Sequence, residues 1–176
     1  EGLEPLLRRP FSICAVEGEG VVTVLYKSVG RGTWLLSGLG PGRRMRVLGP
    51  LGKGFRLPDP SFSPVLVTGG IGAAPMVFLV RSIGPRSFRW LAGYRTSAEI
   101  PPFPELRVPF DKIYIATEDG SAGEECLVTE LLESSLESAR EHVCVFSCGP
   151  SAMLKKVAAI TERYQVPTQV SIETVM

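Results

Sequence analysis

From residue 65 onward, short apolar runs alternate with segments of helical spacing. The apolar runs predict strands at residues 65–68, 88–93, 113–117, 143–147 and 169–172. The intervening segments predict helices at residues 73–82, at 128–133 with an extension towards Arg140, and at 151–163. Strands separated by helices are typical of a parallel, doubly wound α/β sheet. We therefore predict an α/β domain over residues 65–176.

Residues 1–58 have a β pattern instead. Strands are predicted at residues 11–16, 21–27 and 45–48. Thr33 is expected to be the N-cap of a short helix that runs to Leu39. These strands are too few to close a barrel, and the chain starts in mid-pattern. We expect a partial β-barrel domain whose N-terminal strands are missing, with the domain boundary in the Pro-rich residues 57–64.

Residues 60–80 carry no charge and are long enough to span a bilayer. However, Pro60, Pro64 and Pro75 interrupt this run, together with three glycines, so a continuous apolar helix is not expected. A buried strand followed by a helix explains the same residues. We predict no membrane span.

The composition is that of a globular protein, with 44% hydrophobic and 21% charged residues. The net charge of +1 gives no electrostatic reason to expect binding to nucleic acid or to an anionic membrane. No leader segment is visible, which indicates a cytoplasmic protein.

The four cysteines, Cys14, Cys126, Cys144 and Cys148, have no C-x-x-C spacing. They are expected to be buried thiols in a reducing compartment rather than disulfides or metal ligands. With His142 as the single histidine, we predict no metal site in this chain and no catalytic triad.

The glycine turn after residue 68 is the first candidate for binding chemistry. Gly69, Gly70 and Gly72 follow an apolar strand, and Pro75 lies where the next helix is expected to begin. Glycines let backbone approach a pyrophosphate, and a helix N-terminus supplies free N–H groups. The spacing differs from G-x-G-x-x-G, so a purely structural tight turn is the alternative.

Two further loops are expected at the same edge of the sheet, because each follows a predicted strand. These are Cys148-Gly149-Pro150 and the loop around Asp119. Open α/β sheets bind ligands at the carboxyl ends of their strands. Each loop alone has an ordinary structural explanation, whereas three loops on one edge predict a single crevice.

The N-terminal region contains two other candidate segments. In Arg9-Pro10-Phe11-Ser12, the guanidinium could bind a phosphate and the aromatic ring could lie against a flat heterocycle. Leu25-Tyr26-Lys27 is followed by Gly32-Thr33, a pair suited to a phosphate at the start of a helix. An ordinary strand entry and a capped surface helix explain these segments equally well.

Taken in order, these motifs resemble those of the ferredoxin-reductase-like flavoproteins. The segments at residues 6–13, 48–55 and 116–121 narrow the resemblance to the electron-transfer subunit of class 1B dihydroorotate dehydrogenase, over essentially the whole chain. The resemblance implies FAD on Arg9, Pro10, Phe11, Ser12, Leu25, Tyr26, Lys27, Gly32 and Thr33. It implies a nicotinamide nucleotide over Gly70, Gly72, Asp119 and residues 148–150.

The same resemblance implies how the whole protein works. Electrons from dihydroorotate would reduce FMN in a catalytic partner subunit and pass through a [2Fe–2S] cluster and FAD to NAD⁺, in an assembly of two subunits of each kind. No residue here is expected to act as a general base. The four-cysteine segment that holds the cluster in the family would lie beyond Met176, and the glycine before the helix at 128 is missing.

Two rival interpretations stay open. One is the electron-transfer subunit of a related enzyme, such as a sulfhydrogenase-type or an NADH–ferredoxin–NADP⁺ oxidoreductase. The other is a nucleotide-binding module without a redox role. For the nucleotide itself, Arg95 after the second strand favours NADP whereas the resemblance favours NAD, and we expect NAD.

Overall fold

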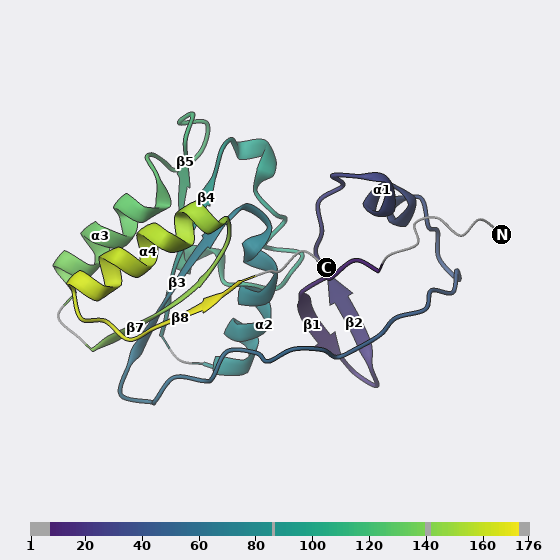
Figure 1. Ribbon diagram of the computed structural model, residues 1–176, viewed down its shortest axis with the longest axis horizontal. Helices are drawn as coiled ribbons and strands as arrows, with labels where there is room; N and C mark the ends of the chain where they lie inside the picture. Colours follow the sequence, from purple (N-terminus) through teal and green to yellow (C-terminus); the bar gives the residue numbers. More distant parts are fainter. Residues whose placement is uncertain (1–7, 86, 140–141, 173–176) are drawn as a thin grey trace.

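The computed structural model describes residues 8–85, 87–139 and 142–172. Within these residues the chain forms two sheets of very different size, which Figure 1 shows side by side. The smaller sheet pairs β1 (Ile13–Glu17) with β2 (Val21–Val24) in antiparallel fashion, and α1 (Arg31–Ser37) follows it. We call residues 8–62 the N-terminal lobe and the described residues from Ser63 onward the sheet lobe.

The larger sheet has six parallel strands in the order β6-β5-β4-β3-β7-β8. Its strands are β3 (Ser63–Gly69), β4 (Arg89–Tyr94), β5 (Ile113–Thr117), β6 (Glu124–Glu125), β7 (Val143–Cys148) and β8 (Thr168–Ser171). Its helices are α2 (Ala73–Ile83), α3 (Val128–Ser138) and α4 (Ser151–Arg163), with single 3₁₀ turns η1 (Gly70–Gly72), η2 (Ser97–Glu99) and η3 (Phe110–Lys112). The predicted doubly wound parallel sheet is confirmed.

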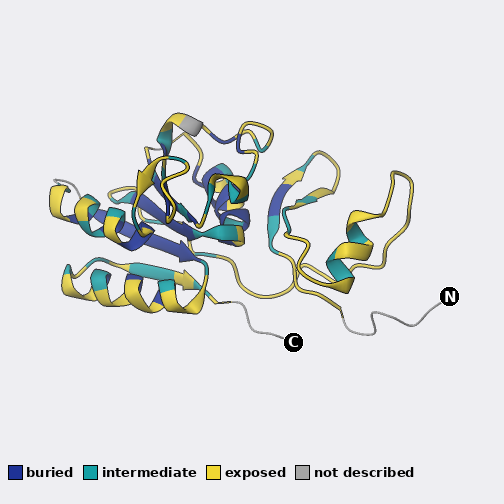
Figure 2. Cartoon of the chain, turned by 90° about the horizontal axis from the view of Figure 1, so that it is seen from above, coloured by how far each residue is buried: buried dark blue, intermediate teal, exposed yellow. Residues whose placement is uncertain are grey.

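The apolar runs form central strands because both faces of the sheet are covered. On one face, Leu66, Trp90 and Phe146 pack with α2 in one core cluster. On the other face, Val67 and Val145 pack with α3 and α4 in a second cluster. Figure 2 shows these strands as the buried layer between helices whose outer sides are exposed.

The segment before α3, where the resemblance implied a glycine that is missing here, forms a short strand. β6 was not predicted, and it pairs with the end of β5 through Ala116–Glu124 and Thr117–Glu125. Gly123, just before it, has a φ of 67°, and any side chain there would overlap the Ile115 carbonyl. A glycine is therefore needed at this position to bring β6 against β5.

The N-terminal lobe differs from the predicted barrel in three places. No strand forms at residues 45–48, where Val47 is 78% exposed, because among the described residues no neighbouring strand pairs with this segment. β2 ends at Val24, so Leu25, Tyr26 and Lys27 lie beyond the strand that was predicted to contain them. The N-cap of α1 is Gly30 rather than Thr33.

The two lobes touch through both apolar and polar side chains. Cys14 of β1 is fully buried in the α2-side core cluster, and Phe55 meets Phe146 edge to face with ring centroids 5.4 Å apart. Arg81 of α2 donates to Glu17 at 3.1 Å. The lobes are therefore joined by a shared core as well as by the chain.

Candidate functional site

The carboxyl ends of β3 and β7 form the switch point of the sheet. From β3 the chain proceeds to β4 on one side, whereas β7 pairs with β3 on the other side. At such a point the loops after the two strands diverge and leave a crevice in which α/β proteins bind ligands. The structure places the predicted glycine turn and the predicted Cys148-Gly149-Pro150 loop together at this point.

Gly70 is the glycine of this turn with open space beside it. Its φ is 53°, in the left-handed region, and a Cβ there would meet no atom within 4 Å. The turn η1 then leads directly into α2, where Pro75 is the third residue and needs no intrahelical hydrogen bond for its nitrogen. Gly70 thus exposes backbone without a side chain just before the N-terminus of α2.

Gly72 has a packing role that was not predicted from the sequence. Gly72 is buried, and a Cβ there would overlap the carbonyl oxygen of Cys148. It would also lie 2.9 Å from the nitrogen of Gly149. The absence of a side chain therefore lets the two loops touch each other. Whether Gly72 also contacts a ligand stays a prediction.

Met153, in the first turn of α4, fills the space between the two loops. A Cβ on Gly69 would lie 2.8 Å from its sulfur, and a Cβ on Gly149 would lie 2.7 Å from its Cε. We assigned no role to Met153 from the sequence, because an apolar residue in a helix pattern indicates core packing and nothing more. The structure places its side chain against both glycine loops.

The loops after β4 and β5 form the next part of the same edge. The amide of Glu118 donates to the carbonyl of Tyr94 at 3.1 Å, and the amide of Asp119 donates to that of Arg95 at 3.2 Å. The Asp119 carboxylate accepts from the amide of Ser121 at 3.0 Å and from its hydroxyl at 2.5 Å. These hydrogen bonds from Ser121 lower the pKa of Asp119, so an anion stands at this loop at neutral pH.

Buried hydroxyls brace the strand ends behind these loops. The indole N–H of Trp90 donates to Thr68 at 2.9 Å, and Ser147 donates to the carbonyl of Val67 at 3.0 Å. Thr117 donates to the carbonyl of Ala122 at 2.7 Å. Each bond links the end of a strand to another segment of the chain, so the loops begin from strand ends that are held in place.

In the N-terminal lobe, the first two candidate segments lie next to each other. The antiparallel pair Ile13–Val24 ends the ladder, and just beyond it the rings of Phe11 and Tyr26 meet edge to face at 5.9 Å. Phe11 is 38% exposed, and Arg9 precedes it in an exposed segment. The structure therefore brings the residues of Arg9-Pro10-Phe11-Ser12 against those of Leu25-Tyr26-Lys27.

Lys27 and Thr33 are engaged within the protein. The Lys27 ammonium lies 2.6 Å from a carboxylate oxygen of Glu99 in the sheet lobe, and the other oxygen accepts the Arg95 amide at 3.4 Å. The hydroxyl of Thr33, in the first turn of α1, accepts the amides of Val29 and Gly30 at 3.0 and 3.1 Å. Lys27 joins the lobes, and Gly32-Thr33 sits on α1, beyond the paired strands.

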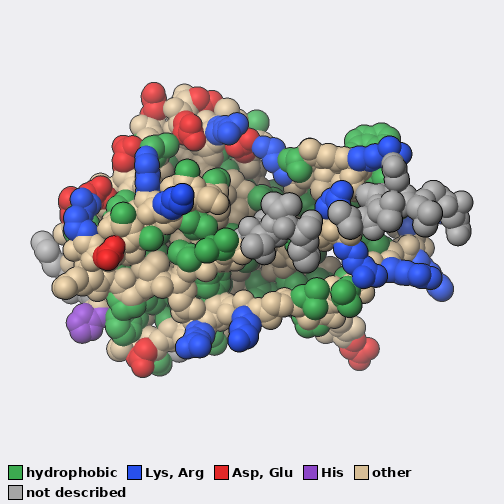
Figure 3. All heavy atoms as spheres, in the orientation of Figure 1, with side chains coloured by type: hydrophobic (Ala, Val, Ile, Leu, Met, Phe, Trp, Pro, Cys, Tyr) green, Lys and Arg blue, Asp and Glu red, His purple; other side chains and the backbone are tan. Residues whose placement is uncertain are grey.

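Charge is distributed unevenly between the lobes, as Figure 3 shows on one face. Residues 20–58 contain no Asp or Glu. The cations of this stretch are Lys27, Arg31, Arg43, Arg44, Arg46, Lys53 and Arg56. A positive N-terminal lobe favours an anionic ligand such as a phosphate ester.

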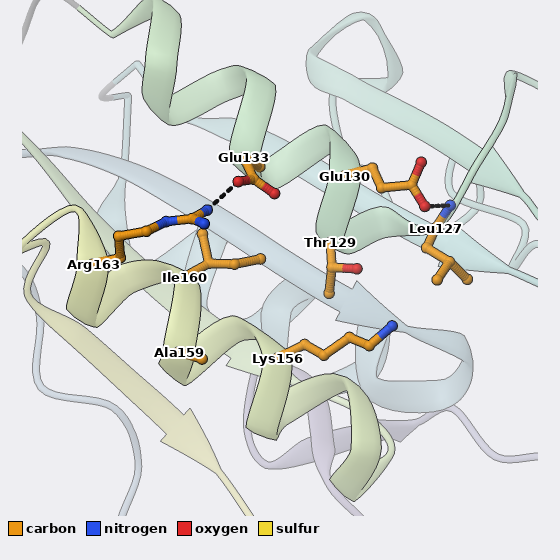
Figure 4. Close-up of a pocket in the computed structure, with 8 residues that line it drawn as sticks. All are labelled: Leu127, Thr129, Glu130, Glu133, Lys156, Ala159, Ile160 and Arg163. Carbon is orange, nitrogen blue, oxygen red and sulfur yellow. Dashed lines mark hydrogen bonds and ion pairs between the residues drawn. The ribbon is translucent and has the colours of Figure 1, made fainter.

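A hollow of about 290 Å³ lies between α3 and α4 (Figure 4). Its two carboxylates are already bonded, because Arg163 pairs with Glu133 and Glu130 accepts the amide of Leu127 at 3.4 Å. None of the residues predicted to bind a ligand lines it. It is therefore separate from the glycine loops at the switch point.

The four cysteines are free thiols in the structure. None of the four cysteines, all of them in the described part of the chain, forms a disulfide, and only Cys126 is not buried. Burial raises the pKa of Cys144 to about 11, so this thiol is protonated at neutral pH. Over residues 8–172, apart from the gaps noted above, no cluster of His, Cys, Asp and Glu could hold a metal ion. None of the described helices has the length and apolar character needed to cross a bilayer.

Comparison with solved structures identifies the fold. An NADH-dependent reduced ferredoxin–NADP oxidoreductase superposes with a TM-score of 0.79 at 26% identity, over 96% of this chain and 62% of that one. The cytochrome P450 reductase GcoB of Amycolatopsis gives 0.76 at 24% identity, over 95% of this chain and 56% of its own. The predicted ferredoxin–NADP reductase-like fold is confirmed.

Comparison with curated sequences identifies the family. No protein-family model matches the chain. The dihydroorotate dehydrogenase B (NAD(+)) electron transfer subunit of Desulforamulus reducens is 38% identical over 173 residues, covering 97% of this chain and 66% of the relative. The subunit of the same name in Clostridium acetobutylicum is 36% identical over 174 residues, covering 99% and 68%. In Geobacillus thermodenitrificans the identity is 37% over 180 residues, covering 98% and 67%.

This chain spans about two thirds of the length of these relatives. The identity extends over nearly all of it, and both the parallel sheet and the small antiparallel sheet fit the reductase fold. The chain therefore belongs to the family of the electron transfer subunits of dihydroorotate dehydrogenase B (NAD(+)).

Proposed function

We propose that this chain is the flavin- and nicotinamide-binding part of a subunit that carries electrons from a dihydroorotate-oxidising partner to NAD⁺. The observation that carries the proposal is the glycine turn at the switch point, with open space beside Gly70 and with Gly69, Gly72 and Gly149 closely packed. The names of the relatives supply the reaction. FAD and NAD are the proposed cofactors, and a [2Fe–2S] cluster is proposed only for the full-length protein.

The residues of the switch-point loops suit a dinucleotide. Bare backbone at Gly70 and the N-terminus of α2 would hold the pyrophosphate, and Asp119 would accept hydrogen bonds from ribose hydroxyls. Cys148, Gly149 and Pro150 would form the opposite wall. Pro75 would contribute by fixing the first turn of α2.

The residues of the N-terminal lobe suit a flavin nucleotide. Arg9 would pair with a phosphate, and Phe11 with Tyr26 would hold the flat ring system. Pro10, Ser12, Leu25, Lys27, Gly32 and Thr33 complete the proposed site. When bound, the flavin would supply the redox chemistry, accepting single electrons on one side and exchanging hydride with the nicotinamide on the other. The protein positions the two rings and excludes water.

The proposed partner is an FMN-containing catalytic subunit, in an assembly with two copies of each chain. The word "subunit" in the relatives' names implies a partner of some kind. Its identity is testable by co-purification from the native source, followed by analysis of flavin content. A partner with hydrogenase or ferredoxin–NADP⁺ activity would instead support the first rival interpretation.

The cofactor proposal is tested by purifying the complete natural protein and recording its spectrum before and after anaerobic addition of NADH. We expect bound flavin that NADH bleaches. A colourless protein that still binds a nucleotide would instead be the non-redox module.

For the choice between NAD and NADP, we expect Arg95→Ala to leave NAD⁺ turnover nearly unchanged. The exposed Arg95 lies between two acids, since its amide bonds Glu99 and its carbonyl bonds the amide of Asp119. The pKa of Glu99 is lowered, chiefly by the hydrogen bond from Lys27, so both acids are ionised at neutral pH and disfavour a 2′-phosphate.

The measurement for Arg95 is the ratio of catalytic efficiencies with NADH and NADPH in a flavin-linked dye-reduction assay. Arg107→Ala, at an exposed arginine of the Pro-rich loop, is the matched control. A preference for NADPH that disappeared in Arg95→Ala would show that Arg95 binds a 2′-phosphate.

A further inference from the structure

Tyr94, the last residue of β4, has a buried hydroxyl without a partner. Its side chain is 4% exposed, and among the residues that the structure describes its oxygen is the one buried side-chain polar atom that makes no hydrogen bond. The other buried hydroxyls at this edge, those of Thr68, Thr117 and Ser147, are all bonded. The orphan is therefore a local exception in an otherwise satisfied region.

An unpaired buried hydroxyl opposes folding, because the group loses its hydrogen bonds to water and gains none. A phenylalanine would fill nearly the same space without this cost. Tyr94 thus carries a polar atom that the ligand-free fold does not use. Such an atom calls for a partner that is absent from the ligand-free protein, either a bound molecule or an ordered water.

The position of Tyr94 identifies the kind of partner. It lies on the same side of β4 as Trp90 and Ala92, in the core cluster that also contains Cys14 of the N-terminal lobe. Leu25, one of the residues proposed to hold the flavin, packs against this cluster while partly exposed. Tyr94 therefore belongs to the core cluster that the two lobes share, which we call the seam, and lies at the carboxyl edge of the sheet next to Arg95, whose amide bonds Glu99.

The apolar surroundings of the Tyr94 hydroxyl favour a neutral hydrogen-bond acceptor carried on an apolar ring. Burial raises the pKa of the Tyr94 phenol above its usual value, so the group is a hydrogen-bond donor at neutral pH. A phosphate would have to lose its hydration among apolar side chains, which is unfavourable. A carbonyl on the edge of a planar heterocycle meets both requirements, since its ring packs against apolar side chains and its oxygen accepts one hydrogen bond.

We propose that the Tyr94 hydroxyl is a ligand-binding group, which donates a hydrogen bond to a ring carbonyl or carboxamide of the nucleotide held between the lobes. This inference rests on the proposed function, because it takes the two nucleotides from there. The isoalloxazine carbonyls of FAD and the carboxamide of the nicotinamide share the required chemistry. Access to the hydroxyl requires the covering side chains of the seam to move aside when the ring enters.

The test uses Tyr94→Phe in the complete natural protein, with Tyr114→Phe as the matched control. Tyr114 is the second residue of β5 and is 51% exposed, so removing its hydroxyl should change neither folding nor binding. In the first arm, the flavin is removed and FAD is titrated back. In the second arm, the protein is loaded with a redox-inactive flavin analogue in place of FAD. NADH is then titrated into it, so that binding is measured without turnover.

We expect Tyr94→Phe to weaken binding about three- to tenfold in one of the two arms, as for the loss of one neutral hydrogen bond. In urea unfolding of the ligand-free protein, we expect the midpoint of the variant to equal or exceed that of the wild type. This combination distinguishes a ligand-binding hydroxyl from a structural one, because a structural hydroxyl would lower the ligand-free midpoint.

Three results would overturn the inference. Unchanged affinity in both arms would show that the hydroxyl meets no ligand, while leaving the proposed function intact. A lower midpoint of ligand-free Tyr94→Phe would assign the hydroxyl to a buried water that supports the fold. Failure of the wild-type protein to bind either nucleotide would remove the proposed function and this inference together.

Discussion

Replacing Gly72 by valine is expected to lower the free energy of unfolding by about 3 kcal/mol, the upper range for overpacking a filled site. The reason is that a Cβ at Gly72 would overlap the carbonyl oxygen of Cys148 and crowd the nitrogen of Gly149. Both are backbone atoms, which cannot rotate out of the way as a flexible side chain could. The loops must therefore separate at the switch point, and nucleotide binding is expected to fall with them.

Gly70→Asn is the matched control for Gly72→Val. Gly70 belongs to the same turn, but its neighbourhood is open and its φ of 53° is one that asparagine adopts more readily than most residues. We expect it to change the unfolding free energy by no more than about 1 kcal/mol, while weakening NAD⁺ binding through its new side chain. Urea unfolding and the Michaelis constant for NAD⁺ measure the two effects separately. Normal stability of Gly72→Val with a raised Michaelis constant would show instead that the missing side chain leaves room for the nucleotide.

The sheet lobe could be predicted from the sequence because its signals are local. A central parallel strand is apolar on both faces, so the apolar residues 65–67 predict one directly. The amphipathic spacing of α4 predicts a helix that buries Leu154 and Val157. The order of strands and helices then places the loops after β3, β5 and β7 on one edge. For these reasons the sequence alone predicts that the glycine turn, Asp119 and residues 148–150 lie at the same edge of the sheet.

The N-terminal lobe was predicted less well because its signals depend on partners. The segment at residues 45–48 has a strand-like composition, but a strand needs a neighbour for its backbone groups. Thr33 has the right residue type for an N-cap, yet its hydroxyl bonds backwards from within the first turn of α1. Propensity describes what a segment could form, and tertiary context decides what it does form.

Contacts between distant residues lay beyond local patterns altogether. Gly72 meets Cys148, Met153 meets Gly69, and Lys27 meets Glu99 only because the sheet and the lobe interface bring them together. The orphan hydroxyl of Tyr94 belongs to the same class. A single tyrosine at the end of an apolar strand gives no sign in the sequence that its oxygen lacks a partner.

Arg9→Ala is expected to weaken FAD binding about ten- to a hundredfold, which corresponds to the loss of a hydrogen bond to a charged group of about 1.5–3 kcal/mol. In the proposed site Arg9 pairs with a flavin phosphate, while Phe11 and Tyr26 hold the ring beside it. The arginine is exposed and lies outside both core clusters, so its removal should leave folding intact. The variant is therefore expected to lose flavin during desalting and to regain it only at higher FAD concentrations.

Two further variants separate specific pairing from general attraction in this positive lobe. Arg9→Lys keeps the charge but not the planar fork, so we expect an intermediate affinity for FAD. Arg44→Ala removes an exposed cation of the same lobe that we place outside the site, and should lower the affinity less than twofold, an effect that added salt would abolish. Equal losses in Arg9→Ala and Arg44→Ala would mean that the lobe attracts FAD by its overall charge. Wild-type flavin retention in Arg9→Ala would remove Arg9 from the site.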